Sequence, residues 1–517
     1  MREKFTRRRF LSVVGAGATC LALTNAVGCD RSERDPRANI PRTKTPKGGA
    51  PSTPKVSHLP TASPAPREGA WAFRSRPDLS PPVVEVTTRA HDTASGYIFL
   101  APEEGDASQG GSLMVDERGQ VVWFRPLPGK YGRVHDLKVQ SYRGKSVLTW
   151  VAGRNDYVIV DHTYREVARF GAGNGYYGDH HEFLISPQDT ALILIYNPVA
   201  WDLSSIGGLK DDRVWQGIVQ ELDIESGEVL FEWHSLDHVG IEESYGKPGE
   251  EAAYPGLDYF HINSIDVDHY GNLLVSARKT FAVYKVDRKT GEVIWRLGGK
   301  MSDFAMGPGA RFAFQHDARR LPDGTISIFD NGMTVFRNGS PRAVEESRGI
   351  VVELDDRKMK ASLLRQYTHP DGLRADAAGN VQVLPNGNVF VGWGRALYFS
   401  EFGKDAELLF DARLPQNRSY RDFRFPWSAQ PSDRPAAAAE RTSEEEVRVY
   451  ASWNGATDVA TWEVLTGSGP GQLESLGSVP RDGFETTMVA RTAEPYVAVR
   501  AKHRSGRILG TSAPVKV

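Results

Sequence analysis

The chain has 517 residues, more than one ordinary domain holds, and 40% of them are hydrophobic, which allows a large core. The 63 basic and 65 acidic side chains give a net charge of −2, so the composition gives no reason to expect a nucleic acid or another generally anionic partner. Both cysteines lie within the first 29 residues, which excludes a disulfide framework, a cysteine metal site and a thiol nucleophile from the rest of the chain.

Residues 1–29 are predicted to be an export segment. The letters TRRRFL from Thr6 to Leu11 have the order of a twin-arginine signal, and the weakly apolar run that follows is too short for a good membrane span. This run ends in AVGC, which resembles a lipobox. We therefore expect export by the twin-arginine route to the cell envelope, with Cys29 lipidated as a membrane anchor. Ordinary cleavage, with Cys29 as a bystander, is the alternative.

Residues 30–69 are rich in Pro, Ser, Thr, Lys and Arg and are predicted to be a flexible tether. From residue 70 to residue 430 the pattern is one of short strands and turns, without a convincing helical period. One unit recurs: an apolar strand, an Asp, a turn and a second apolar strand. Its six copies run from Leu113 to Trp123, Val158 to Phe170, Gln220 to Trp233, Tyr284 to Trp295, Val352 to Leu364 and, with Gly403 in place of Asp, Phe399 to Phe410.

These repeats predict an all-β fold with a six-bladed β-propeller over residues 70–430. We interpret the recurring Asp as structural, because its carboxylate accepts backbone N–H groups in a tight turn. The Trp or Phe that ends the hairpin is interpreted as packing between blades.

A second pattern places histidines at one register before the next pair of strands. It reads VHDL, HHEF, FHIN, QHDA and GNVQ, around His135, His180 and His181, His261, His316 and Asn380. The innermost strand of each propeller blade starts beside the central channel, so we expect these side chains to converge there. Neighbouring residues of a strand point to opposite faces, so only one of His180 and His181 is expected in the channel.

Such a group of side chains suits a tetrahedral oxyanion, as in sulfate or phosphate ester chemistry. Neutral His is a base or nucleophile, and protonated His stabilises an anion. Asn263 shares a strand face with His261, and arginines at positions 278, 296, 319 and 320 lie in the same stretch. Zinc or copper on the histidines is the competing interpretation. The chain has no HExxH or His-x-His pair, and we expect neither metal nor cofactor.

Near residue 430 the composition changes. Residues 431–446 are rich in Pro, Ala and Glu and are predicted to be a linker. Residues 447–517 alternate like the strands of a small immunoglobulin- or fibronectin-like β-sandwich, with Trp453 in its core. The alternative is that these strands extend the propeller, but the Asp-turn hairpin does not recur in them.

Several motifs, in the same order, resemble the bacterial arylsulfotransferase family: DYFHINSID (258–266), KTGEVIWRLGG (289–299), QHDA (315–318) and FDNG (329–332). HHEF (180–183), QVLPNG (382–387) and SYRDFRFPW (419–427) are similar to its actinobacterial-type branch. The resemblance covers Phe73 to Trp427. It implies a six-bladed propeller that moves a sulfuryl group from a phenolic sulfate ester to a phenol through a sulfo-histidine, without a nucleotide donor.

The resemblance also implies roles for single residues. His261 and His316 match the family's motif histidines. The family's active-site arginine follows its Asp-Asn-Gly turn, where Arg337, Arg342 and Arg348 are all candidates. The expected catalytic set is His261, His316, His181, Asn263 and Arg348. The expected substrate-binding set is His135, His180, Arg319 and Asn380.

Three alternatives remain open from the sequence. The covalent histidine is not assigned, and His369 is a reserve candidate. A non-catalytic propeller that binds a ligand or protein at the cell envelope is the second hypothesis for the function. A metal- or quinone-dependent oxidoreductase on the same architecture is the third.

Overall fold

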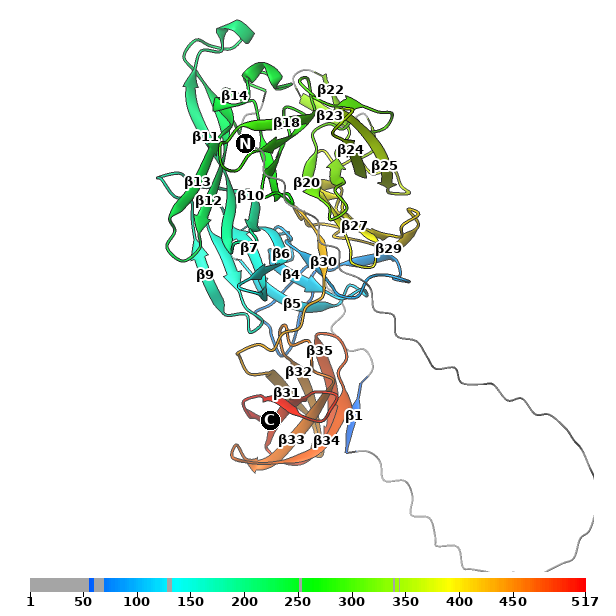
Figure 1. Cartoon of the computed structure of the whole chain (residues 1–517). Helices are drawn as coiled ribbons and strands as arrows, with labels where there is room; N and C mark the ends of the chain where they lie inside the picture. The colour runs from blue at the N-terminus through cyan, green and yellow to red at the C-terminus, as the bar shows by residue number, and fades with distance from the viewer. Residues whose placement is uncertain (1–54, 60–68, 128–132, 251–252, 338–339, 344) are drawn as a thin grey trace, which may run out of the picture. The chain divides into compact units, whose positions relative to one another are not determined.

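A computed structural model describes residues 55–59, 69–127, 133–250, 253–337, 340–343 and 345–517 (Figure 1). The predicted export segment and most of the predicted tether lie outside these residues. The described chain is all-β, as predicted, and none of its helices is long and apolar enough to cross a membrane. The helices in this part are single 3₁₀ turns: η1 (Ser204–Ile206), η2 (Ser235–Asp237), η3 (Ile241–Glu243) and η4 (Gly394–Ala396).

Six sheets of four or five strands, paired mostly antiparallel, and one two-stranded sheet make up the described chain from residue 85 to residue 425. The first combines β3 (Tyr97–Leu100), β4 (Gly111–Val115) and β5 (Val121–Pro126) with the late strand β30 (Phe423–Phe425). The second is β6 (Val134–Tyr142), β7 (Lys145–Ala152), β8 (Tyr157–Val160) and β9 (Glu166–Phe170). The third is β10 (Gly178–Ile185), β11 (Thr190–Trp201), β12 (Asp212–Asp223), β13 (Val229–His234) and, parallel to β12, β14 (Leu257–Asp258).

The other three sheets follow the same plan. The fourth is β15 (Ile262–Val267), β16 (Leu273–Ala277), β17 (Ala282–Val286) and β18 (Val293–Gly298). The fifth is β20 (His316–Arg320), β21 (Ile326–Asp330), β24 (Arg348–Asp355), β25 (Lys360–Thr368) and β19 (Ala305–Met306); beside it β22 (Met333–Arg337) pairs with β23 (Ser340–Ala343). The sixth is β26 (Asn380–Val383), β27 (Val389–Gly392), β28 (Tyr398–Phe402), β29 (Leu408–Arg413) and β2 (Glu85–Thr88).

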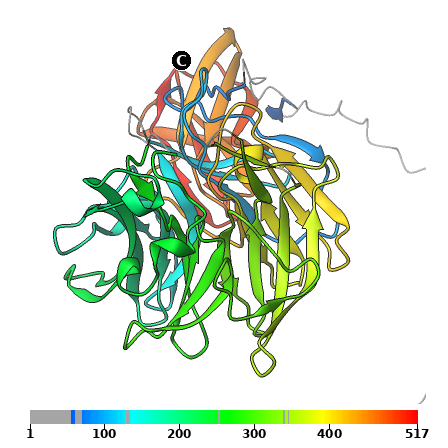
Figure 2. The same cartoon turned by 90° about the horizontal axis from the view of Figure 1, so that it is seen from above.

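Neighbouring sheets contact one another mainly through their first strands, and the series of contacts returns to the first sheet. β6 contacts β10, β10 contacts β15, β15 contacts β20, β20 contacts β26, and β30 contacts both β6 and β27. The sheets therefore lie side by side around a common centre (Figure 2). Because β30 comes from the far end of this part of the chain and pairs with β3, the chain closes the circle on its own first sheet.

Each of the six predicted hairpins is an antiparallel pair of outer strands. The recurring Asp has the predicted structural role: Asp161, for example, accepts the backbone N–H groups of Thr163 and Arg165 at 2.8 and 3.2 Å. The aromatic residues at hairpin ends are packed between sheets, as predicted. Trp233 of β13, for example, is 2% exposed and packs in one cluster with residues of β15, β16 and β17.

Two further sheets form the C-terminal part of the chain and share one apolar core that includes Trp453. The strands are β1 (Val56–His58), β31 (Ala436–Ser443), β32 (Glu446–Ser452) and β35 (Glu485–Arg491) in one sheet, and β33 (Thr461–Gly469), β34 (Gln472–Pro480), β36 (Tyr496–Lys502), β37 (Ile508–Thr511) and β38 (Val515–Lys516) in the other. Two boundaries differ from the prediction. The predicted linker 431–446 contains β31, and the predicted tether contains β1. Both are edge strands that pair along one side only, which lets a Pro- and Ala-rich segment join a sheet.

Candidate functional site

The histidines predicted at one register line a single cavity of about 560 Å³. They come from or directly precede the first strands of four successive sheets, β6, β10, β15 and β20. The cavity histidines are His135, His180, His181, His261 and His316. The repeat in the sequence therefore placed these side chains correctly, because equivalent positions of sheets that surround one centre lie close together.

A β-bulge marks each of these four strands at the histidine. The pairing register shifts between His135 and Lys138, between Gly178 and Phe183, between Ile262 and Ser264, and between His316 and Arg319. Asp136, His261 and Asp317 have φ angles of 56°, 52° and 53°. A bulge sets two residues against one and re-aims their side chains, and non-glycine residues at such angles cluster at functional sites.

The bulge in β10 corrects one expectation. His180 and His181 were expected on opposite faces, but both line the cavity, and their ring centroids lie 4.4 Å apart. Regular alternation holds only where the strand is regularly paired, and the pairing of β10 is interrupted between Gly178 and Phe183.

Tyr420, in the segment just before β30, lies among the imidazoles. Its ring centroid is 5.4 Å from that of His181, 5.9 Å from that of His135 and 6.3 Å from that of His316. Its hydroxyl is buried and has no hydrogen-bond partner among the described residues. Burial raises the pKa of this hydroxyl, so it keeps its proton at neutral pH and can donate it to a bound group.

Two of the histidines are each held by a carboxylate. Nδ1 of His181 is hydrogen-bonded to Asp179, and Nδ1 of His261 is hydrogen-bonded to Asp258. An ionised carboxylate only accepts, so Nδ1 carries the proton and Nε2 carries the lone pair in the neutral rings. The two rings lie 5.3 Å apart, centroid to centroid. Two Asp–His pairs thus present their imidazoles to the cavity, each with the tautomer that a nucleophile or base requires.

His316 is held differently. Its Nδ1 lies 2.7 Å from Oδ1 of Asn331, and its Nε2 accepts the backbone N–H of Ala378 at 3.3 Å. Both ring nitrogens are therefore engaged by neutral groups. Burial lowers the pKa of His316 well below its usual value, with the nearby Arg278 adding to the effect, so the ring is neutral at pH 7.

Burial sets the charge on several other groups. It lowers the pKa of His135 well below the usual value and that of His180 to about 4. Burial alone would raise the pKa of Asp179, but the adjacent His181 and His180 outweigh it and lower that pKa. Burial raises the pKa of Asp258 to about 6, against the opposing effect of Lys279 and Arg278. The imidazoles of His135, His180 and His316 are therefore neutral at pH 7, and the lining also contains arginines that carry positive charge.

Arg278 supplies that charge inside the cavity. It directly follows β16, and its backbone N–H donates to the carbonyl of His261 at 2.9 Å, which places the two residues beside each other. Its guanidinium lies 4.7 Å from the ring centroid of Phe314 and donates to the carbonyl of Asp376 at 3.2 Å. The lining also includes three more arginines and three acids: Arg133, Arg395, Arg418, Glu103, Glu250 and Asp376.

A buried cluster of three acids and three bases lies one residue further along the same strands. Its members are Asp136, Lys138, Glu182, Asp317, Arg319 and Arg421. Arg421 is fully buried and lies 2.9 Å from Asp136 and 3.1 Å from Glu182. Lys138 contacts the same two carboxylates at 2.7 and 2.6 Å. The charges balance, and the cluster joins three first strands to the segment before β30.

This cluster corrects the role of Arg319. The residue was expected to bind substrate, but its guanidinium contacts Glu182 and Asp317 at 2.6 Å and does not line the cavity. The acids that follow the register histidines attract it. Arg319 therefore belongs to the buried charged cluster next to the cavity and has a structural role.

Other predicted site residues also lie elsewhere. Asn263 and Asn380 are fully buried and donate to the carbonyls of Gln315 and Asp422, both at 2.7 Å, so each joins neighbouring sheets. Arg348 is held by Asp330 at 3.0 Å and lines a different cavity. The side chains of Arg337 and Arg342 lie outside the described residues.

His369 does not reach the cavity either. It is 5% exposed, its Nε2 lies 3.2 Å from Asp411, and its Nδ1 accepts the backbone N–H of Asp371. It is a structural residue of the turn that follows β25.

Sequence reasoning missed Tyr420, Arg421, Asp179 and Asp258 and could not choose Arg278 among four arginines. A signal existed for some of them. Tyr420 and Arg421 stand in the SYRDFRFPW run that the resemblance had already singled out, at the place of a sixth register motif. Their equivalence to the histidines was hidden because β30 joins the first sheet, not a new one.

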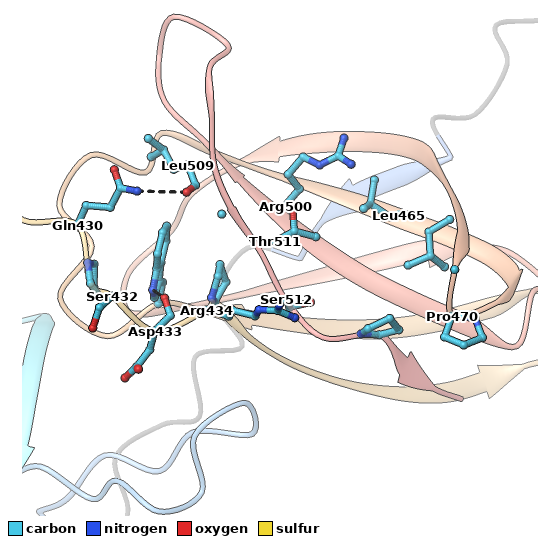
Figure 3. A pocket seen from close by; sticks show the side chains of 17 residues that line it. Gln430, Ser432, Asp433, Arg434, Leu465, Pro470, Arg500, Leu509, Thr511 and Ser512 are labelled. Atoms are coloured by element: carbon cyan, nitrogen blue, oxygen red, sulfur yellow. Dashed lines mark hydrogen bonds between the residues drawn. The ribbon is translucent and has the colours of Figure 1, made fainter. Parts of the chain in front are cut away.

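A cavity of about 640 Å³ in the C-terminal part carries less chemistry (Figure 3). Its lining includes Asp433 and Arg434 but no histidine, and Gln430 closes one end with a 3.2 Å hydrogen bond to the carbonyl of Leu509. Arg500 of this lining is already paired with Glu463 at 3.1 Å. The histidine cavity is therefore the candidate active site.

Residues 138–414, more than half of the chain, match the family model for arylsulfotransferase (ASST). The chain belongs to the arylsulfotransferase family. No curated protein matches it in sequence. The matched range contains His180, His181, His261, His316 and Arg278, whereas His135 and Tyr420 lie just outside it.

Similar solved structures are distant. A protein of unknown function from Bacteroides caccae is 13% identical, with a TM-score of 0.39, over 63% of this chain and 98% of that one. A catalytically inactive virginiamycin B lyase from Staphylococcus aureus, solved with quinupristin, is 7% identical, with a TM-score of 0.33, over 79% of this chain and 99% of that one. Kuenenia stuttgartiensis hydrazine synthase is 12% identical, with a TM-score of 0.32, over 66% and 86%. At such values, none of these likenesses carries weight for the activity of this chain.

Proposed function

We propose that this protein transfers a sulfuryl group from a phenolic sulfate ester to a phenol through a histidine of the cavity. The observation that carries the proposal is the pair of Asp–His units whose imidazoles line the cavity, beside an arginine, in a chain that belongs to the arylsulfotransferase family. The reaction needs a nucleophile, a base and donors for the sulfuryl oxygens, and this cavity offers all three.

His261 is the proposed nucleophile. Asp258 holds the Nδ1 proton, so the lone pair lies on Nε2. In the first half-reaction a bond forms between Nε2 and sulfur, the bond between sulfur and the aryl oxygen breaks, and phenolate leaves. In the second half-reaction an acceptor phenol oxygen attacks sulfur, the bond between nitrogen and sulfur breaks, and the phenol proton passes to a base. The nearby His181 is that base.

Arg278 and Tyr420 are the proposed donors to the sulfuryl oxygens. Negative charge on these oxygens has to be stabilised during in-line attack, whereas a phenolate leaving group needs little protonation. Arg278 is charged and lies beside His261, and the buried hydroxyl of Tyr420 has a proton to donate. Loss of one such donor typically lowers turnover about 100- to 1,000-fold. His316, with both nitrogens engaged, is proposed to position the backbone at Ala378.

A burst experiment tests the proposal. An aryl sulfate mixed with the protein, before any acceptor is added, should release one phenol per active chain, followed by ping-pong kinetics with an acceptor. His261→Ala should abolish the burst, and peptide mapping of the wild type should find the sulfuryl group on His261. A burst that survives in His261→Ala but not in His181→Ala would assign the nucleophile to His181. No burst and no transfer, in protein proven folded, would favour the non-catalytic binding propeller.

We also propose how this enzyme is built and where it acts. The six sheets from residue 85 to residue 425 are taken as blades of a six-bladed propeller, and the two C-terminal sheets as an immunoglobulin- or fibronectin-like sandwich. Export by the twin-arginine route and lipidation at Cys29 would place the site outside the cytoplasm. Replacing Arg7 and Arg8 by Lys should block export, and Cys29→Ala should release the protein from the membrane fraction. A Cys29→Ala protein that stays membrane-bound would contradict lipidation.

A further inference from the structure

One wall of the cavity concentrates donor atoms: His181, the proposed base, stands there beside His135 and His180, which have no role in the proposed transfer. His180 lies 4.2 Å from His135 and 4.4 Å from His181, centroid to centroid. Asp179, His180 and His181 each offer one possible ligand atom, and these atoms all lie within 4.8 Å of one another. Regular strand alternation would let only one of His180 and His181 reach the cavity, which would leave too few donors for a metal. The bulge in β10 removes that argument.

We propose that Asp179, His180 and His181 form a binding site for a divalent transition-metal ion, with His135 as a neighbouring fourth donor. Two imidazoles and one carboxylate bind zinc in catalytic centres and iron(II) in non-haem oxygenases. The nitrogen donors favour zinc, cobalt, nickel or copper over magnesium and calcium, which take oxygen ligands. Since His180 and His181 line an open cavity, the remaining coordination positions of the metal face the space beside His261.

The surroundings of His135 support the site. His135 is 7% exposed, and its Nδ1 has no hydrogen-bond partner among the described residues. A buried nitrogen without a partner is unusual in a native protein, and a metal bound beside it would supply one.

Calorimetry and spectroscopy on the full chain test this proposal without any substrate, so its outcome does not depend on sulfuryl transfer. The chain, stripped with a chelator, is titrated with Zn²⁺ alone, and with Co²⁺ to record visible d–d bands. One ion per chain is expected. His180→Ala and His181→Ala should each weaken binding by at least about 100-fold, more than the loss of a residue that only orients a ligand. His316→Gln, a cavity histidine outside the set, should leave binding within about twofold.

The controls decide the remaining outcomes. His503→Ala removes a partly exposed histidine of the C-terminal part, far from the proposed ligands in sequence, and should not change metal binding. Far-ultraviolet circular dichroism checks that each variant is folded. If the two ligand variants do not fold, Cu²⁺ electron paramagnetic resonance of the wild type decides, because coupling to at least two imidazole nitrogens supports the site. No bound ion, binding that is unchanged in folded His180→Ala, or a Cu²⁺ spectrum without nitrogen coupling would overturn the proposal.

Discussion

Two layers of side chains from the same strands have contrasting environments in this protein. The upper layer, His135, His181, His316 and Tyr420, lines an open cavity. The lower layer begins with the residues that directly follow these four: Asp136, Glu182, Asp317 and Arg421. It is charged and sealed from solvent. Each of these four cavity residues is therefore directly followed in the sequence by a residue of the buried charged layer.

The bulges produce this separation. The regular pairing of β6, β10 and β20 is interrupted at the register histidine. The bulge directs the histidine into the cavity and the next residue into the buried charged layer. The two layers also touch, since the guanidinium of Arg421 lies 5.0 Å from the ring centroid of Tyr420. We infer that the lower layer holds the upper one in place, and that damage to each layer should show in a different measurement.

The largest effect should come from the lower layer. Arg421→Met leaves three carboxylates facing two cations in a buried space, and breaking a buried ion pair typically costs about 3–5 kcal/mol. Denaturant unfolding at pH 7 measures this loss. The matched control is Arg418→Met, an exposed arginine of the cavity lining, which should change stability by no more than about 0.5 kcal/mol. Equal effects of the two substitutions would contradict a supporting role for the lower layer.

Asp258→Asn should damage the upper layer without unfolding the chain. The amide cannot hold the Nδ1 proton of His261 as a carboxylate does, so the transfer rate should fall at least about 100-fold. Stopped-flow measurement of the phenol burst checks it, with the unfolding midpoint as the control. Asp179→Asn sharpens the comparison, because it should slow the second half-reaction more than the burst if His181 is the base. A burst of unchanged rate in Asp258→Asn would remove His261 from the role of nucleophile.

The transfer rate should depend on pH through Asp258. Burial raises its pKa to about 6, so the carboxyl is protonated below that value and ionised above it. The rate should therefore be level above about pH 6 and fall about tenfold for each pH unit below it. His180, with a pKa of about 4, adds its charge only at lower pH. A rate that rises on acidification through pH 6 would contradict this assignment.

The smallest effect should come from the outer hairpins, far from both layers. Asp161→Ala removes the acceptor for two backbone N–H groups in the turn between β8 and β9 and should cost about 1 kcal/mol. The burst amplitude should not change. Thermal unfolding and the burst assay together check this expectation. A loss of activity at full stability would mean that the turn Asp has a role beyond structure.

The repeats made much of the fold predictable, because the signals are local. A strand, an Asp that caps a turn and a second strand specify a hairpin without help from elsewhere, and all six predicted hairpins are antiparallel pairs. The edge strands β1 and β31 were missed for the opposite reason. Their composition resembles a linker, and pairing with one neighbour is what makes them strands.

The site was predictable only in part. The register histidines were found from the repeat alone. Asn263, Asn380, Arg319 and Arg348 were placed by spacing or by resemblance, and each lies outside the cavity. Asn263 and Asn380 are held by carbonyls of neighbouring sheets that are distant in the sequence. Arg319 and Arg348 are held by carboxylates, which spacing along the chain did not reveal. The carboxylates of Asp179 and Asp258 were missed because their role is to hydrogen-bond His181 and His261, and no sequence motif marks such a pair.

The sequence by itself determined the all-β character, the hairpins and the histidine register, because each depends on residues close together in the chain. Only the tertiary structure decided which neighbours of a histidine reach the cavity, that Arg278 is the arginine beside His261, and that Tyr420 and Arg421 complete the two layers. The physical reason is that the ring of sheets is closed by a strand from the end of this part of the chain. β30 pairs with β3 more than 300 residues earlier, so the last register position enters the site through contacts between the two ends of the sheet-forming chain, which no local pattern contains.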